Sequence, residues 1–338
     1  MNTRTNRART FLVAPLLALT TACVSDRQVI SQANTAHREL DAAVLRDVQL
    51  ADYLQSVGDR IIAAAREYDE SGGGSKSKRD EDNAWMFSKD MQFHLVNSKT
   101  LNAFTTGGEH MYIYSELFQQ CETEDELAAV MAHEYAHVYA RHVHKGMQRQ
   151  YIVAGGSLAA GLAGQQIGGD EHGSTYAQLA AMGAGVLGQF LSMGYTRDDE
   201  AEADALGFRF YARAGWDPDR FADFFQQMID KGMDTTPEYM SDHPTLESRV
   251  DAAKKRAKSL PPEASQWRQP PVADATLFAL KKDQLVEAGK RMPSTEDIAA
   301  AQTLLAAVPS CLLPVDQPEQ KQAQAALARE LQSRSAKP

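Results

Sequence analysis

The sequence predicts a mainly helical α+β fold that contains a small β-sheet. Two observations support the helices: apolar residues recur at helical spacing over residues 27–68, and a largely apolar helix begins at Thr123 and continues past His142. A third observation supports the sheet, because short runs of strand-forming residues lie within 85–98 and at 111–114. We expect an edge strand of this sheet to lie beside the helix that begins at Thr123.

The first 22 residues have the layout of a secretory signal peptide. Three arginines and no acid are followed by an apolar run and by small residues just before Cys23. This pattern resembles a bacterial lipobox, in which Cys23 becomes the lipidated first residue and Val24 directs the protein to the outer membrane. Thr20 stands where such boxes usually carry leucine, so ordinary cleavage after Ala22 is the alternative.

The formal net charge is −10, and losing the three arginines of residues 1–22 would bring it to −13. A surface of this charge repels phosphate, so we expect no nucleic-acid partner.

Two cysteines remain after Cys23, namely Cys121 and Cys311. An even pair in a chain exported to an oxidising compartment favours a disulfide between them. Two ordinary buried thiols are the alternative.

The predicted sheet has three candidate strands. Residues 85–90 and 92–98 suit two short strands joined by a tight turn, and a Gly107-Gly108 turn precedes the third strand at 111–114. If this last strand forms a sheet edge, it can hold an extended peptide by backbone pairing.

The stretch MAHEYAHVYARH, residues 131–142, places polar groups inside an apolar helix. Thr123 followed by Glu126 predicts a capping box at its start, and apolar residues on all sides indicate burial. His133 and His137 project from one face one turn apart and can hold a single metal ion, while Glu134 beside them can reach a water there. Because burying these groups without partners is costly, a metal centre is favoured.

A catalytic zinc needs a third protein ligand. His142 is nine residues from His133 and would point to the opposite side of a continuous helix, and His144 lies three turns away, so we expect both at the surface. The acidic cluster at 197–207 is the better source, because Glu200 and Asp204 share a helix face. One carboxylate can bind the metal and the other can accept a ligand histidine's N–H. Spacing alone does not choose between Glu200 and Glu202.

The motifs together resemble one known family. HEYAHVYARH, EAEAD about sixty residues later, NAF and GG before the helix and a His-Pro dipeptide after it are similar to the HtpX/Oma-type zinc metallopeptidases of the gluzincin group, especially their exported lipoprotein members. The resemblance covers about residues 28–258. It implies a zincin-like fold and one Zn²⁺ per chain, with ligands His133, His137 and Glu200. It also implies that Glu134 is the catalytic base and that Asp204 supports a ligand histidine.

The family's HPxxxxR element matches His243 and Arg249. The resemblance implies that His243 approaches the zinc or the scissile carbonyl and that Arg249 lies nearby. An ordinary helix start at Pro244 is the alternative for this element.

The sequence suggests three parts: a signal peptide at 1–22, a metallopeptidase domain at 24–258, and a proline-rich linker with a helical extension at 259–338. Within the extension, residues 274–308 predict two short helices, and the tail from 317 onward is expected to fray. Within the domain, residues 151–196 are rich in Ala and Gly and predict two helices joined by a polar turn. Two membrane spans are the alternative for that segment.

The resemblance implies a periplasmic endopeptidase that is anchored to the outer membrane through Cys23 and cleaves unfolded or misassembled envelope proteins. Its zinc would polarise the scissile carbonyl and activate water, with Glu134 as the base. A chaperone-like outer-membrane assembly factor that binds metal but cleaves little is the alternative.

Overall fold

The computed structural model describes residues 24–73, 81–162, 194–233, 244–313 and 317–335. The predicted signal peptide, Cys23, His243 and most of the 151–196 segment lie outside these residues. Among the helices of the described ranges, none combines the length and apolar character that a membrane crossing requires.

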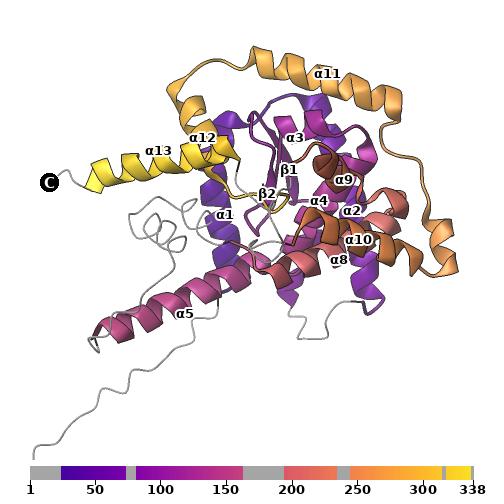
Figure 1. Ribbon diagram of the computed structural model, residues 1–338, viewed down its shortest axis with the longest axis horizontal. Coiled ribbons are helices and arrows are strands. Elements are labelled where there is room, and N and C mark those ends of the chain that lie inside the picture. Colours follow the sequence, from indigo (N-terminus) through magenta and orange to yellow (C-terminus); the bar gives the residue numbers. More distant parts are fainter. Residues whose placement is uncertain (1–23, 74–80, 163–193, 234–243, 314–316, 336–338) are drawn as a thin grey trace, which may run out of the picture.

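A three-stranded sheet occupies the middle of the molecule (Figure 1). Strand β3 (His110–Tyr114) pairs with β1 (Gln92–Val96) in parallel and with β2 (Ala103–Thr105) in antiparallel orientation. The mainly helical α+β class is therefore confirmed. The strand at 111–114 is central, however, because it has a neighbour on both sides. The edge beside the HExxH helix is β2, so the prediction that β3 holds an extended peptide is wrong.

The expected strand at 85–90 is also wrong. Residues Glu81–Phe87 form the 3₁₀-helix η2. Side chains from neighbouring helices donate hydrogen bonds to two of its carbonyl groups. The Tyr135 hydroxyl donates to the Met86 carbonyl, and the Arg66 guanidinium donates to the Phe87 carbonyl. With these carbonyls satisfied, a strand ladder is not needed there.

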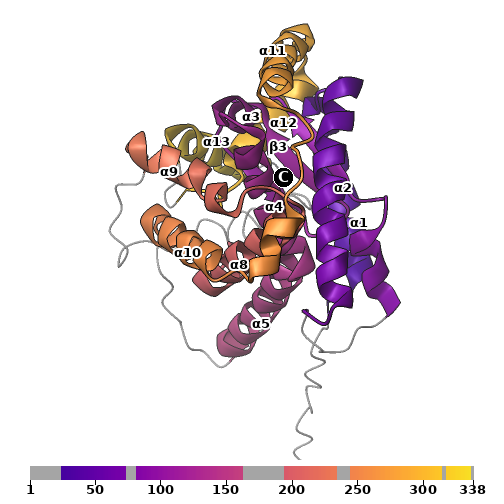
Figure 2. The same ribbon diagram turned by 90° about the vertical axis from the view of Figure 1, so that its right-hand side faces the viewer.

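The helical region 27–68 is two helices, α1 (Asp26–Leu40) and α2 (Val48–Glu70), which Figure 2 shows together at one side of the molecule. Between them lies the 3₁₀-helix η1 (Asp41–Ala43), and Val44 forms a bridge to Val96 of β1. The Asp47 side chain caps the N-terminus of α2. The chain thus turns where it touches the sheet, which periodicity alone does not reveal.

Helix α4 (Glu124–Tyr139), which carries the HExxH motif, packs against α8 (Arg197–Arg213). Gly207 of α8 makes this approach possible, because a Cβ at that position would lie 2.9 Å from the His133 Cα. The short helix α3 (Ser115–Gln120) connects β3 to α4, and α5 (His142–Leu162) projects away from the body in Figure 1.

The C-terminal part of the chain wraps around this body. The two helices predicted within 274–308 are confirmed as α11 (Ala275–Arg291), which runs along the top of Figure 1, and α12 (Glu296–Ala307). The tail does not fray but forms α13 (Pro318–Ser335), since the buried Gln320 amide donates to the Val308 carbonyl. The other helices of the described ranges are η3 (Pro218–Arg220), α9 (Asp223–Asp230), α10 (Leu246–Lys258) and η5 (Pro262–Trp267).

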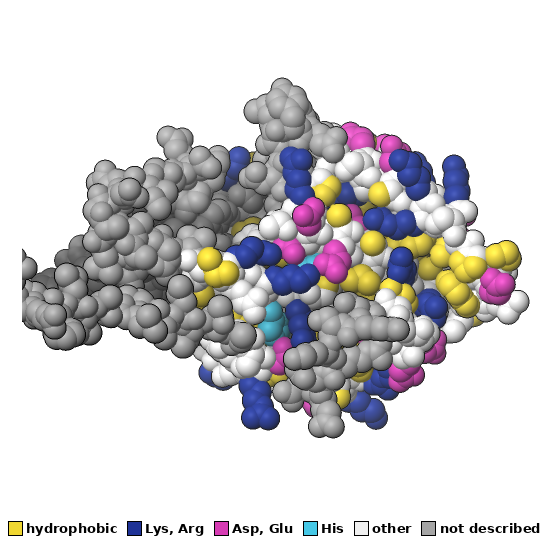
Figure 3. Space-filling view, turned by 90° about the horizontal axis from the view of Figure 1, so that it is seen from below, with side chains coloured by type: hydrophobic (Ala, Val, Ile, Leu, Met, Phe, Trp, Pro, Cys, Tyr) yellow, Lys and Arg dark blue, Asp and Glu magenta, His cyan; other side chains and the backbone are white. Residues whose placement is uncertain are grey.

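The surface carries charges of both signs. In Figure 3, basic and acidic side chains are interleaved over the part drawn in colour, with hydrophobic side chains between them.

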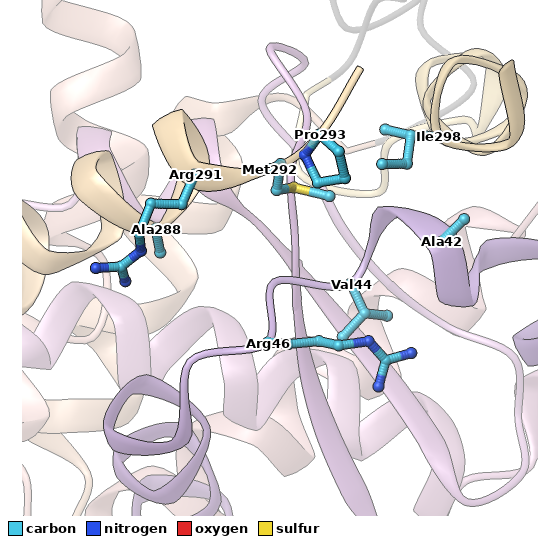
Figure 4. Close-up of a pocket in the computed structure, with 8 residues that line it drawn as sticks. All are labelled: Ala42, Val44, Arg46, Ala288, Arg291, Met292, Pro293 and Ile298. Carbon is cyan, nitrogen blue, oxygen red and sulfur yellow. The ribbon is translucent and has the colours of Figure 1, made fainter. Parts of the chain in front are cut away.

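A pocket of about 290 Å³ lies between the η1 segment and the junction of α11 with α12 (Figure 4). Both arginines in its wall are already paired, Arg46 with Asp41 and Arg291 with Asp47. None of the predicted metal-site residues lines it. The lining residues are Ala42, Val44, Arg46, Ala288, Arg291, Met292, Pro293 and Ile298.

Candidate metal centre

Helix α4 begins where the sequence predicts, but its cap differs. Thr123 is the N-cap residue without a side-chain cap bond, and it accepts a hydrogen bond from Arg220 instead. The Glu126 carboxylate reaches back to the backbone N–H of Glu122. The predicted capping box is therefore wrong, although Glu126 still satisfies a free N–H at the helix start.

The helix ends at Tyr139 rather than continuing past His142. Arg141 adopts the left-handed conformation (φ 58°), and α5 starts in a new direction at His142. This break turns His142 back toward α4, so that its Nδ1 lies 2.9 Å from Nδ1 of His137. His142 and His144 are both buried, and the prediction that they lie at the surface is wrong because it assumed one continuous helix.

The side chains of His133, His137 and Glu200 meet at one buried point between α4 and α8. Nε2 of His133 lies 3.1 Å from Nε2 of His137 and 3.4 Å from Oε2 of Glu200, and Nε2 of His137 lies 3.8 Å from Oε1 of Glu200. Ligands about 2.1 Å from a tetrahedral zinc are separated by about 3.4 Å. The spacing of these three groups therefore matches a metal tripod.

The chemistry of this tripod also fits a cation. Neither carboxylate oxygen of the fully buried Glu200 has a hydrogen-bond partner among the described residues. A buried carboxylate without partners is strongly unfavourable unless a cation binds it. Burial lowers the pKa of His133, but the hydrogen bond to Asp204 and the Glu200 carboxylate 3.4 Å away outweigh this and raise the pKa to about 9. The carboxylates beside His133 thus favour positive charge next to them, whether a proton or a metal ion carries it.

A buried ion pair supports His133 from behind. Asp204 Oδ1 accepts from His133 Nδ1 at 2.9 Å, and both Asp204 oxygens accept from the Arg249 guanidinium at 2.7 and 2.9 Å. Burial alone would raise the pKa of Asp204, but Arg249 and His133 hold it well below its usual range. The Asp204–Arg249 pair fixes the imidazole of His133 so that its Nε2 points toward His137 and Glu200.

A second chain of contacts supports His137. His142 Nδ1 lies against His137 Nδ1, and His142 Nε2 lies 3.1 Å from Oε2 of Glu202. The Tyr195 ring stacks on His137, with 3.9 Å between the ring centroids. Glu202 therefore contacts His142 and not the tripod, an arrangement that the sequence did not predict.

We expect His142→Leu to weaken zinc binding by about 10- to 100-fold, because the His137 N–H that orients the ligand loses its acceptor. Competition with a chromophoric chelator measures this affinity. His144→Leu is the matched control, since it makes the same change two residues along and His144 contacts Asp26 instead. Equal zinc affinity in His142→Leu and the parent would contradict the role of His142.

The two cysteines do not form the predicted disulfide. Both are free and buried: Cys121 caps the end of α3, whereas Cys311 lies in the metal centre, where its Sγ donates to Glu134 Oε1 at 2.8 Å. The fold places one thiol at the end of α3 and the other beside Glu134. The even number of cysteines therefore did not indicate a disulfide.

Glu134 lies beside the tripod with one oxygen engaged and one open. Oε1 accepts from Cys311, and Oε2 has no hydrogen-bond partner within the described ranges. Burial raises the pKa of Glu134 to about 7, despite the opposing charge of His133. A bound cation would lower this pKa and leave the carboxylate ready to accept a proton.

Another cluster of three histidines lies between α1 and the sheet. His94 of β1 is hydrogen bonded to His110 of β3, and the rings of His37 and His110 stack with 4.1 Å between centroids. Burial, together with the charge of His37, lowers the pKa of His94 to about 3 and that of His110 to about 4. These side chains stay uncharged at neutral pH.

This cluster predicts a loss of stability in acid. In the unfolded chain a histidine has its ordinary pKa, so below about pH 6.5 the unfolded state binds protons that the folded state does not bind. The free energy of unfolding therefore falls as the pH is lowered. At about pH 5 one such histidine costs about 2 kcal/mol of unfolding free energy. Urea unfolding with a chelator present, at about pH 7.5 and pH 5, should show this loss in the parent and a smaller one in His94→Phe. Equal losses in both proteins would contradict the prediction.

Several residues at the centre were not predicted in these roles, namely His142, Glu202, Tyr195 and Cys311. A helix-breaking signal at residues 140–141 would have redirected His142, but the sequence carries neither glycine nor proline there. No local pattern places Cys311, which is 177 residues from Glu134.

A mainly helical fold with a HExxH helix beside a sheet edge, and a buried carboxylate from a later helix facing its two histidines, has the arrangement of a metallopeptidase of the gluzincin type. Residues 76–257 match Peptidase family M48, and the chain belongs to this family. Its members are metallopeptidases, so the resemblance noted in the sequence is confirmed.

Three relatives illustrate the relationship. The beta-barrel assembly-enhancing protease of Yersinia pestis is 30% identical over 237 residues, which are 68% of this chain and 43% of that protein. The protein of the same name from Escherichia coli K12 is 29% identical over 67% of this chain and 42% of its own length. The mitochondrial metalloendopeptidase OMA1 of Saccharomyces cerevisiae is 30% identical over 50% of this chain and 48% of its own length. The chain thus spans less than half of each of these relatives.

Proposed function

We propose that this chain is a zinc endopeptidase of the bacterial cell envelope that cleaves unfolded or misassembled proteins. The observation that carries the proposal is the tripod of His133, His137 and Glu200, in which the Glu200 carboxylate is buried without a hydrogen bond from any described residue. Membership in a metallopeptidase family supports the same chemistry.

In this proposal His133, His137 and Glu200 would hold a zinc ion, which would supply Lewis acidity for the scissile carbonyl and the attacking water. Glu134 accepts the proton of the attacking water at Oε2 and later passes it to the leaving amine. Asp204 and His142 hold the two imidazoles in the ligand orientation. Arg249 keeps Asp204 charged and in place.

The edge of β2 that faces away from β3 is the proposed place for an extended peptide, because an edge strand offers backbone groups that no neighbouring strand pairs. Backbone pairing reads little side-chain sequence, so it suits loosely folded substrates. His243 and Arg249 stay proposals as further groups at this centre, and of the two only Arg249 lies among the described residues, 3.3 Å from His133.

The location is part of the proposal. A signal peptide ending at Ala22 and a lipid on Cys23 would hold the enzyme at the periplasmic face of the outer membrane. The relatives named beta-barrel assembly-enhancing proteases support an envelope role.

The test uses the chain from Val24 onward, which contains every described residue. It should hold one zinc and cleave a loosely folded protein such as casein, with loss of cleavage on chelation and recovery on adding zinc. The assay includes Cys311→Ala, because the thiol lies against Glu134. No zinc-dependent cleavage in either protein would contradict the proposed peptidase and favour the chaperone-like alternative.

A further inference from the structure

The thiol of Cys311 lies inside the metal centre, although it comes from the C-terminal extension. Its Sγ belongs to one group with His133, His137 and Glu200, and the ligand atoms of the four residues lie within 4.8 Å of one another. All four side chains are buried. A sulfur in this place can complete a tetrahedral set of ligands.

A fourth protein ligand would change what the centre does. Catalytic zinc sites keep three protein ligands and leave one position open, whereas sites with four protein ligands are closed. Thiolate is among the strongest protein ligands for zinc. The same sulfur also contacts Glu134 Oε1, so it occupies one oxygen of the proposed base. One side chain would therefore take the metal position that water needs and also occupy one oxygen of the proposed base, Oε1, while Oε2 stays open.

The segment that carries Cys311 is firmly held. Arg249 donates to the Cys311 carbonyl at 2.8 Å, and the Asn102 amide donates to the Val308 carbonyl at 3.2 Å. The flanking Leu312 and Leu313 are buried in the core. Arg249 also donates to Asp204, which accepts from His133. The guanidinium therefore links the Cys311 segment to the residue that orients His133. These contacts show that residues 308–313 are built into the centre.

The same extension covers the approach to β2. The side chain of Gln317 accepts from the backbone N–H of Leu101 at 3.2 Å and donates to the Leu101 carbonyl at 2.9 Å. The two bonds use both the N–H and the C=O of Leu101, as a neighbouring strand would do when it pairs with the chain just before β2. An extended substrate would compete for those groups.

We propose that Cys311 is the fourth ligand of the bound metal and that residues 308–313 hold the peptidase in a latent form. The inference rests on the proposed function. When the metal binds, the S–H bond breaks, the sulfur donates its electron pair to the metal, and the proton leaves through Glu134 Oε1. When the segment withdraws, the sulfur takes up a proton from solvent and one metal position opens. A competing chain at β2 is the event expected to withdraw it.

The first test reads the ligand directly and does not depend on activity. Thiolate bound to cobalt(II) gives a charge-transfer absorption in the near ultraviolet that nitrogen and oxygen ligands do not give. The chain from Val24 onward, loaded with one cobalt(II), should show this band. Cys311→Ala and the nearly isosteric Cys311→Ser should lose it, while Cys121→Ala, the matched change at the other buried thiol, should keep it. A parent without the band, or a band that persists in both Cys311 variants, would overturn the proposed ligand.

The second test measures latency on casein at equal zinc content. Cys311→Ala should cleave at least about 10-fold faster than the parent, because the rate follows the fraction of molecules with an open centre. Cys121→Ala should match the parent. Equal rates in the parent and both Cys311 variants would overturn latency while leaving the peptidase intact. If all the proteins hold zinc and none cleaves, the proposed peptidase fails, and the cobalt band still decides whether Cys311 is a ligand.

Discussion

Replacing Glu134 by glutamine should lower casein hydrolysis by about 10²- to 10⁴-fold while the protein keeps its zinc. The glutamine side chain has nearly the same size and keeps an oxygen that can accept a hydrogen bond, but it cannot take a proton from water. The three proposed ligands are untouched, so metal content should stay at one per chain. The comparison is best made in the Cys311→Ala background, where the centre is open.

Glu126→Gln is the matched control for this experiment. It makes the same change on the same helix at another buried glutamate, whose carboxylate bonds the Glu122 backbone and not the tripod. We expect this variant to cleave at the parental rate. A Glu134→Gln variant that cleaves as fast as its background would remove Glu134 as the base and direct attention to His243.

Replacing Arg249 by methionine should destabilise the metal-free protein by about 3–5 kcal/mol. Arg249 and Asp204 are both buried and joined by two hydrogen bonds, so the variant leaves a carboxylate in the core without its cation. The Cys311 carbonyl also loses its donor. Urea unfolding with a chelator present measures the effect without the contribution of bound metal.

Two further variants make this result specific. Arg268→Met removes an arginine whose ion pair with Asp217 is partly exposed to solvent, and we expect it to change stability by less than about 1 kcal/mol. Asp204→Asn combined with Arg249→Met removes both charges but keeps an acceptor for His133, so it should recover part of the lost stability. If Arg249→Met and Arg268→Met cost the same, the buried pair is not what holds this region together.

Much of the fold was predictable because it depends on short-range patterns. Helical periodicity identified α4, α11 and α12, and the run at 111–114 identified β3. The role of β3 as the central strand was not predictable, since pairing with β1 is decided by segments that meet only in the folded chain. Helix α13 was missed because its many polar residues resemble a solvated tail.

The sequence alone determined the chemistry of the centre. Four-residue spacing puts His133 and His137 on one helix face, and the same spacing aligns Glu200 with Asp204. These relations lie within single helices, so they follow from helix geometry wherever the helices are placed.

Only the tertiary structure decided which groups complete that centre. Residues two apart on a helix point about 200° away from each other, so docking α8 on α4 brought Glu200 to the histidines and left Glu202 for His142. The turn at Arg141 returned His142 to the site, and the core packing of residues 308–313 brought in Cys311. These outcomes depend on contacts between distant segments, and no local pattern in the sequence encodes them.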